Sequence, residues 1–415
     1  MDRLKGLMRI AFITQQTPYG KGEGFIIDEL IEFARQGHDM TVFPMRPEAD
    51  VYHSDAKAIR SHAVSMPLVT LPLILSFFKF IILQPGKALD IAKMLLHSRS
   101  PGILIKNVAV LPKAIWIAQQ IRSKGIVHIH AYWASTSATA GMIVSHLSGL
   151  SWSFTCYRWD VADDNLLALK HQSAEFIRCP DEQSRAEVAS ICKLRDLGKL
   201  HLIRSGIRVP TASSPAPDTD TPRPFCFVVP AMMVEKKGHV YLLEAVRLLA
   251  DRKYTFTCWL IGDGPLREKI ENTVHQLGID TRIEMKGLMR LEEMRNMYQA
   301  NLVDVVVLPS IVTQDNQKEG IPASLIDALS YGVPVISTTT GGIPELVTPD
   351  VGLLVEPRNP VELAHGMEHL MNHPAIIRQM SVAARQRIEE HFDVVAVVRH
   401  MSELMQSQAS EDRLR

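Results

Sequence analysis

Short apolar runs of strand length alternate along the chain with longer segments in which apolar residues recur at helical spacing. The first run covers residues 8–14, and a loop with three glycines leads from it to a helical segment over 25–36 and a second apolar run over 40–43. This order is typical of a βαβ unit in a parallel sheet. The loops at the carboxyl ends of such strands form the ligand crevice. We therefore expect an α/β fold with its site on these loops.

The same alternation returns in the second half of the chain. It predicts strands and helices in turn over residues 225–229, 239–250, 256–261, 265–277, 282–285, 291–300, 303–308, 321–331 and 333–337. Between the halves, residues 209–224 contain five prolines and no apolar period, which excludes a helix or an interior strand. We predict two doubly wound domains, 1–208 and 224–392, a linker at 209–223, and a C-terminal helix at about 393–410 that packs back on the first domain.

The charges of the chain balance, with 45 Lys and Arg against 45 Asp and Glu in 415 residues. No global field then draws the whole chain onto nucleic acid, so we expect no nucleic-acid partner. The five cysteines are scattered and form no CxxC pair, which argues against a disulfide framework or a zinc cluster. Together with an N-terminus that lacks the pattern of a secretion signal, this favours a cytoplasmic location.

Residues 66–84 form the one stretch long and apolar enough to suggest a membrane span, although two prolines and Lys79 weaken that interpretation. The alternatives are a helix buried in or beside the first domain and an interfacial membrane contact. Four basic side chains follow the stretch: Lys87, Lys93, His97 and Arg99. They suit lipid headgroups or an ordinary solvated face, so a peripheral contact of residues 66–99 with the inner face of the membrane stays open.

Two glycine-containing loops in the second half lie between a strand and a helix, where backbone N–H groups and the positive helix end can bind an anion. In the loop 234–238, Lys237 can place an ammonium against a diphosphate while Gly238 lets the backbone come close. The other loop is the turn from Gly262 to Gly264. A solvated loop and a tight turn that needs glycine are the respective alternatives.

A longer motif follows between residues 308 and 345. Helical spacing would put Glu319 at the mouth of a helix and Asp327, eight positions on, on nearly the same side, where both address one ligand. An acid at a helix start is also a common partner of the helix dipole, but this does not explain the whole run. The run consists of Leu-Pro-Ser at 308–310, Glu-Gly-Ile-Pro-Ala-Ser-Leu-Ile-Asp at 319–327, Gly-Val-Pro-Val-Ile-Ser at 332–337 and Gly-Gly-Ile-Pro-Glu at 341–345.

This motif resembles that of the retaining GT-B glycosyltransferases of family 4, in particular the branch that builds exopolysaccharides such as colanic acid. The resemblance covers nearly all of residues 8–392 and is strongest over 233–356. It implies a GT-B fold, in which two Rossmann-like domains face a central cleft. It also implies that Lys237 binds the donor diphosphate, that Glu319 binds the sugar, and that Asp327 stands where the ribose-binding glutamate would be.

Further site residues follow from the same resemblance. The implied donor-binding residues, besides Lys237 and Glu319, are Gly238, Gly262, Gly264, Gly287, Leu288, Pro309, Ser310, Gly320, Ile321, Pro322 and Asp327. In the first domain, segments 127–134 and 151–161 look like those that line the cleft. They place His130 among the catalytic residues and Gly22, Gly24, Tyr157, Arg158 and Asp160 on the acceptor side. His128 and His130 share one face of a strand, so a structural hydrogen bond and a metal site without an evident third ligand are alternatives.

Three positions depart from the family pattern. Met232 stands where the family has an arginine before its lysine, Tyr157 replaces a histidine, and Asp327 shortens the second carboxylate. Methionine offers no guanidinium fork to a diphosphate, and tyrosine titrates too high to replace an imidazole. Arg158 or Arg204 could supply the missing cation.

The resemblance implies a retaining, metal-independent transfer of a sugar from a nucleotide-diphosphate sugar, UDP- or GDP-linked. The implied acceptor is a hydroxyl of a saccharide, a lipid-linked saccharide or another small molecule, in polysaccharide or glycoconjugate biosynthesis. No cofactor is expected, since the nucleotide sugar is a substrate. Because of the three departures, a catalytically silent GT-B scaffold that binds a partner stays open. A GT-B sugar-nucleotide epimerase also stays open, although the helix at Glu319 gives it no support.

Overall fold

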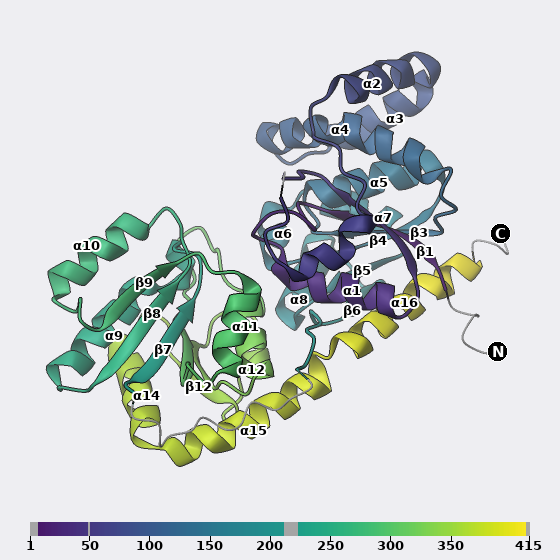
Figure 1. Ribbon diagram of the computed structural model, residues 1–415. Helices are drawn as coiled ribbons and strands as arrows, with labels where there is room; N and C mark the ends of the chain where they lie inside the picture. Colours follow the sequence, from purple (N-terminus) through teal and green to yellow (C-terminus); the bar gives the residue numbers. More distant parts are fainter. Residues whose placement is uncertain (1–6, 49, 211–222, 412–415) are drawn as a thin grey trace, which may run out of the picture. The chain divides into compact units, whose positions relative to one another are not determined.

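The computed structural model describes residues 7–48, 50–210 and 223–411 and divides into two compact units (Figure 1). Unit 1 comprises Met1–Gly206 and Val394–Arg415, and unit 2 comprises Ile207–Asp393. Residues 211–222, most of the expected linker, lie outside the described residues. Each unit is built on a parallel six-stranded sheet, which confirms the α/β class with two doubly wound domains.

The sheet of unit 1 has the strand order β2-β1-β3-β4-β5-β6. Its strands are β1 (Arg9–Thr14), β2 (Asp39–Pro44), β3 (His128–Tyr132), β4 (Ser151–Thr155), β5 (Phe176–Cys179) and β6 (Leu200–Leu202). Five of the six residues of β1, and all of those of β3 and β4, are buried. Parallel strands covered on both faces are expected to read as continuous apolar runs, which is the pattern of residues 10–13.

Helices cover both faces of this sheet. They are α1 (Ile27–Arg35), α2 (Leu71–Leu83), α3 (Pro85–Leu96), α4 (Pro101–Ile121), α5 (Thr136–Ser148), α6 (Arg158–Asp163), α7 (Leu167–Ser173), α8 (Glu182–Ile191) and α16 (Val394–Glu411). The last helix packs on α1 and buries Val398, Met401 and Met405 in a core shared with β1 and β2. The end of the chain thus belongs to unit 1.

A buried ion pair joins distant segments of unit 1. Arg178 on β5 donates two hydrogen bonds of 2.7 Å to the carboxylate of Glu29 on α1, and neither side chain is exposed. Glu29 also accepts from the hydroxyl of Tyr132 and the backbone N–H of Gly206. Because the charges are both paired and hydrogen-bonded, the cluster can exist in the core and fixes α1 against β3 and β5.

The sheet of unit 2 has the order β12-β11-β10-β7-β8-β9. Its strands are β7 (Phe225–Pro230), β8 (Phe256–Ile261), β9 (Ile283–Gly287), β10 (Val305–Leu308), β11 (Val335–Thr338) and β12 (Gly352–Val355). Its helices are α9 (His239–Asp251), α10 (Arg267–Leu277), α11 (Leu291–Gln299), α12 (Ala323–Ser330), α13 (Ile343–Leu346), α14 (Pro360–Asn372) and α15 (Pro374–His391).

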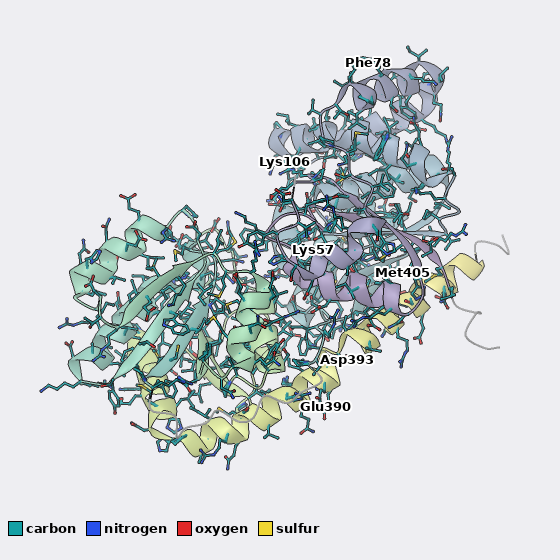
Figure 2. The ribbon with its side chains drawn as sticks, viewed as in Figure 1. Lys57, Phe78, Lys106, Glu390, Asp393 and Met405 are labelled. Atoms are coloured by element: carbon teal, nitrogen blue, oxygen red, sulfur yellow. The ribbon has the colours of Figure 1, made fainter. Side chains whose placement is uncertain are left out.

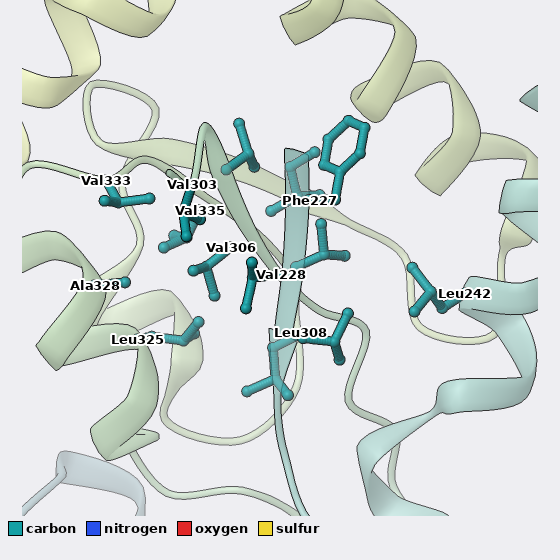
Figure 3. Close-up of a cluster of buried hydrophobic side chains, with 14 of the residues drawn as sticks. Phe227, Val228, Leu242, Val303, Val306, Leu308, Leu325, Ala328, Val333 and Val335 are labelled. Atoms are coloured by element: carbon teal, nitrogen blue, oxygen red, sulfur yellow. The ribbon is translucent and has the colours of Figure 1, made fainter. Parts of the chain in front are cut away.

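The core of unit 2 surrounds its central strands. Figure 3 shows Phe227 and Val228 of β7 beside Val306 and Leu308 of β10, with Leu325 of α12 against them. All five are fully buried. This packing holds the loops that follow β7 and β10 at one edge of the sheet, where the site lies.

Candidate functional site

The loop after β7 forms one wall of the candidate site in unit 2. A single 3-10 turn, Glu235–Lys237, leads to Gly238, which is left-handed and directly precedes α9. The backbone N–H of Ile311 donates to the carbonyl of Lys236 at 2.8 Å. This bond ties the loop after β10, with Pro309 and Ser310, to the lysine-bearing turn.

Glu319 lies between the two lysines of this turn. The ammonium of Lys236 is 2.9 Å from Oε1 of Glu319, and the ammonium of Lys237 is 3.2 Å from Oε2. The side chains of Lys236 and Glu319 are 5% and 8% exposed, whereas that of Lys237 is 14% exposed. Sequence reasoning identified Lys237 and Glu319 but missed Lys236, which the Lys-Lys pair before Gly238 could have signalled.

The two ammonium groups decide the charge of Glu319. Burial by itself would raise the pKa of this carboxyl, but Lys237 and Lys236 outweigh burial and hold the pKa below its ordinary value. Burial lowers the pKa of Lys236, and Glu319 counteracts this. The site therefore holds an ionised carboxylate beside two lysines in a water-poor environment, where electrostatic interactions are strong.

The segment of Glu319 is fixed by the loop after β11. Gly341 has φ +61°, and a Cβ at this position would lie 1.9 Å from the carbonyl oxygen of Glu319. The backbone N–H of Gly342 donates to the same carbonyl at 3.3 Å. Only glycine at position 341 permits this close approach, so the Gly-Gly pair fixes the backbone at Glu319.

Asp327 is not joined to Glu319 by the continuous helix that the spacing suggested. The helix α12 begins at Ala323, four positions after Glu319, because Pro322 is extended (φ −70°, ψ 122°) and caps it. Asp327 is buried and pairs with Arg295 of α11 at 2.9 Å. The i to i+8 argument was therefore wrong in its premise, and Gly320, Ile321 and Pro322 form a non-helical lead to α12.

The turn at Gly262 supports the structural alternative. Gly262 has φ +144°, and a Cβ there would lie 2.0 Å from the carbonyl oxygen of Ala231. Its N–H donates to the carbonyl of Gly287 at 2.8 Å, while Gly264 lies against Met233. Helix α10 begins only at Arg267, so the expected helix mouth at Pro265 was placed too early. The fold alone thus requires glycine at Gly262.

Met232 and His239, on either side of the lysine turn, differ sharply in exposure. Met232, where the resemblance implied an arginine, is 60% exposed. Leu288, after β9, is 49% exposed. His239, the first residue of α9, is buried, and within the described part of the chain neither ring nitrogen has a hydrogen-bond partner. Burial, with the charge of Lys237, lowers the pKa of His239 to about 4. Sequence reasoning missed His239.

The residues expected on the acceptor side lie at the carboxyl ends of β1, β3 and β4 in unit 1. Gly22 is exposed, and Gly24 opens a 3-10 turn. Between them, Glu23 accepts from the N–H groups of residues 15–17 and from the indole of Trp133. Trp133 has φ +78° and lies 4.7 Å from Tyr157, ring centre to ring centre. Burial raises the pKa of Tyr157 well above its ordinary value, so this residue stays neutral.

His130 is enclosed in the core of unit 1. Its ring nitrogens contact the hydroxyls of Ser153 and Thr155 at 2.8 and 3.0 Å, and the side chain is not exposed. His128 is bonded in the same way to Ser151 and Ser153. Burial lowers the pKa of both imidazoles. This geometry agrees with the structural alternative for the two histidines, and among the described residues no group of three His, Cys, Asp or Glu could hold a metal ion.

The remaining charged candidates of unit 1 have partners. Arg158 donates a hydrogen bond from each of its two terminal guanidinium nitrogens to the carboxylate of Glu187 on α8. Asp160 accepts from the N–H of Tyr157 at 3.0 Å and so caps α6, and burial raises its pKa to about 7. The backbone carbonyl of Arg204 accepts from Arg178. These contacts give Arg158 and Asp160 structural roles.

Sequence comparison shows that unit 2, which holds the site, is similar to known glycosyltransferases. Residues 216–387 match the family model of Glycosyl transferases group 1. The putative colanic acid biosynthesis glycosyltransferase WcaL of Escherichia coli (strain K12) is 29% identical over 217 residues, which are 50% of this chain and 51% of WcaL. The amylovoran biosynthesis glycosyltransferase AmsK of Erwinia amylovora is 28% identical over 177 residues, 42% of this chain and 43% of AmsK. The chain thus spans about half the length of these relatives.

Structural comparison covers both units. Anabaena Alr3699/HepE, solved in complex with UDP and glucose, has a TM-score of 0.71 at 16% identity over 96% of this chain and all of that one. Sucrose-phosphate synthase of Thermosynechococcus elongatus has a TM-score of 0.70 at 18% identity over 97% of this chain and all of that one. The protein therefore has the GT-B fold.

Proposed function

We propose that this protein is a glycosyltransferase that moves a sugar from a nucleotide-diphosphate sugar to a hydroxyl of a saccharide or lipid-linked saccharide in polysaccharide biosynthesis. The observation that carries the proposal is Glu319 held between Lys236 and Lys237 at the carboxyl end of the sheet of unit 2. The match to Glycosyl transferases group 1 over residues 216–387 includes all three side chains. UDP-glucose bound to HepE and the polysaccharide pathways named for WcaL and AmsK support the classes of donor and acceptor.

The lysine pair suggests how the donor binds. Lys237 is the more exposed of the two, and its ion pair with Glu319 is the longer one. A diphosphate carries more charge than a carboxylate and can therefore draw the Lys237 ammonium away, while Lys236 remains with Glu319. The exchange costs little because Glu319 keeps a cationic partner in the buried site. Glu319 is then free on its Oε2 side to accept hydrogen bonds from sugar hydroxyls.

The chemistry follows from the charge that develops during transfer. As the glycosidic bond to the diphosphate stretches, the leaving group gathers negative charge, and a preorganised ammonium stabilises it. We propose that the reaction retains the anomeric configuration and needs no metal, with the leaving phosphate accepting the proton of the acceptor hydroxyl. We also propose a cytoplasmic location, which the five free cysteines support.

The direct test is a panel of UDP-, GDP- and ADP-sugars, assayed by thermal shift and by release of the nucleotide diphosphate. We expect one donor to raise the melting temperature and to be consumed when a saccharide acceptor is added. Anomeric proton spectra of the product then report retention or inversion. A donor that binds tightly but is never consumed with any acceptor would overturn the enzyme proposal in favour of a silent scaffold, which Met232 and the pairing of Asp327 with Arg295 would then explain.

A further inference from the structure

Exposed apolar side chains concentrate on one part of unit 1. Among the described residues, twelve of the 23 exposed large apolar side chains lie between positions 69 and 108, on and around α2, α3 and α4. Those of unit 2 are spread over several elements. Monomeric proteins rarely expose a concentrated apolar patch unless it binds something.

The helix α2 is apolar on two opposite sides. Leu73 and Phe80 are buried against unit 1, with Phe77 partly buried beside them. Leu71, Leu75, Phe78 and Ile82 follow each other at spacings of three and four residues and are 68%, 60%, 57% and 76% exposed. Residues at this spacing share one face of a helix. We call these four side chains the outer α2 face.

The outer α2 face points away from the sheet. Helix α5 packs on β3 and β4, α4 packs on α5, and α2 packs on α4. Figure 1 shows α2 and α3 as the outermost layer of this stack, beyond α4, and Figure 2 shows Phe78 at that end of the unit. Leu89 and Leu96 of α3 and Ile105 of α4 add further exposed apolar surface.

These helices lie on unit 1 rather than span a bilayer. By length and composition α4 could cross a membrane, and so could α2 and α3 together, although they are bent by 110° at their junction. However, Lys113 on α4 is buried and donates to the carbonyls of Pro44, Met45 and Met66. Asn107 of α4 is bonded to Asn165 at 2.9 Å. These buried polar contacts would be lost if α4 entered lipid, so the helices stay part of the unit.

The charges around the patch identify its partner. The segment between residues 66 and 110 has five exposed basic side chains and one acidic side chain, Asp90, in a chain whose total charge is balanced. They are Lys79, Lys87, Lys93, Arg99 and Lys106. An exposed apolar face on a segment with this excess of basic side chains matches a membrane surface with acyl chains beneath anionic headgroups.

We propose that the outer α2 face, with the basic side chains of α2–α4, docks this protein peripherally on an anionic membrane. Leu71, Leu75, Phe78 and Ile82 enter the boundary between headgroups and acyl chains, and the lysines bind anionic headgroups. The proposal does not depend on the transferase activity, because it concerns other residues and is measured without any sugar. It places a lipid-linked acceptor within reach of the protein on a surface instead of in solution.

The test measures co-sedimentation of the full chain with phosphatidylcholine vesicles that contain or lack phosphatidylglycerol. Each large apolar side chain that enters the membrane adds about tenfold to the partition coefficient. The double variant Leu75→Glu/Phe78→Glu should therefore lose about 100-fold on anionic vesicles. Both side chains are largely exposed, so no cavity forms. Val382→Glu on α15, where the wild-type side chain is 70% exposed, is the matched control and should bind as wild type does.

The electrostatic part is tested separately. Lys79→Gln and Lys93→Gln should each lower binding to anionic vesicles about fivefold and make that binding less dependent on salt. Binding to neutral vesicles should stay unchanged. In Phe78→Trp, brominated lipid should quench the new indole. Equal binding by wild type and Leu75→Glu/Phe78→Glu overturns the proposal. So does a concentration-dependent dimer, seen by light scattering without vesicle binding and lost in the double variant, because the face would then bind a second copy.

Discussion

Replacing each of the neighbouring lysines with methionine separates donor binding from support of Glu319. Methionine keeps a long apolar side chain and removes the charge. In the structure the two ammonium groups bind different oxygens of Glu319, at 2.9 Å from Lys236 and 3.2 Å from Lys237. If Lys237 moves to the diphosphate and Lys236 stays with the carboxylate, the two variants fail in different ways.

The expected losses follow from burial. Removing one partner of a buried ion pair costs about 3–5 kcal/mol, because a charge is left uncompensated. Lys236→Met should fall at the low end, about 3 kcal/mol in the free energy of unfolding, since Lys237 still faces Glu319. Lys237→Met leaves the shorter and more buried pair intact. The free energy of unfolding of this variant should fall by about 1 kcal/mol, the upper value for ion pairs that water can reach.

Urea unfolding, calorimetric titration with the donor found in the panel, and transfer kinetics measure the three quantities. Lys237→Met should lose about 10²-fold or more in kcat/KM and should bind donor weakly while remaining folded. Lys236→Met should be the less stable protein and should bind donor more weakly than wild type, because Lys237 can then leave Glu319 only by stranding a buried carboxylate. Lys269→Met, at an exposed lysine of α10, is the control and should match wild type. Unchanged donor affinity in Lys237→Met, or a larger stability loss there than in Lys236→Met, would refute the division of roles.

Three further outcomes are expected. Although burial opposes them, the two lysines hold the pKa of Glu319 below its ordinary value, so its ion pairs contribute stability that is present above the ordinary carboxyl pKa and lost as the pH falls through the lowered one. The difference in unfolding free energy between wild type and Glu319→Gln should therefore narrow in acid, and a constant difference would contradict an ionised Glu319. Asp327→Ala and Arg295→Ala should each destabilise the protein by about 3 kcal/mol, with a coupling energy in the double-mutant cycle, whereas additive losses would exclude the pair. Met232→Arg should change stability by less than about 0.5 kcal/mol, because the side chain is exposed, and should tighten donor binding in the calorimetric titration through a bidentate phosphate contact; unchanged affinity would show that a second cation already serves.

The alternation of strands and helices could be predicted because parallel strands are buried on both faces. Segments such as 225–229 and 305–308 are continuous apolar runs for that reason, and the structure places β7 and β10 at the predicted strands 225–229 and 303–308 with shifts of at most two residues at their ends. The place of the loop after β7, between a strand and a helix, was predicted in the same way, whereas the binding role of Lys237 came from the resemblance and stays a prediction.

What the sequence could not supply was the pairing of charges across distant segments. Glu319 and Asp327 look equivalent along the chain, yet α12 begins only after Pro322. As a result Glu319 pairs with Lys236, whereas Asp327 pairs with Arg295. The two faces of α2 pose the same problem. Its apolar residues cover the helix all round, so periodicity cannot tell the packed side from the exposed one.

Buried cations show which charges are available to a ligand. In unit 1, Lys170 donates to the carbonyls of Ala134, Ser135 and Asn165, and Lys113 is likewise enclosed by three carbonyls. Neither ammonium group can move away without leaving buried carbonyl oxygens unpaired, so both lysines are structural although they carry a positive charge. Lys237 differs, because its ion-pair partner among the described residues, Glu319, still has Lys236 beside it. In the proposed binding step, a second lysine that keeps the carboxylate neutralised would let Lys237 leave it, and a buried site could then accept a diphosphate at low cost.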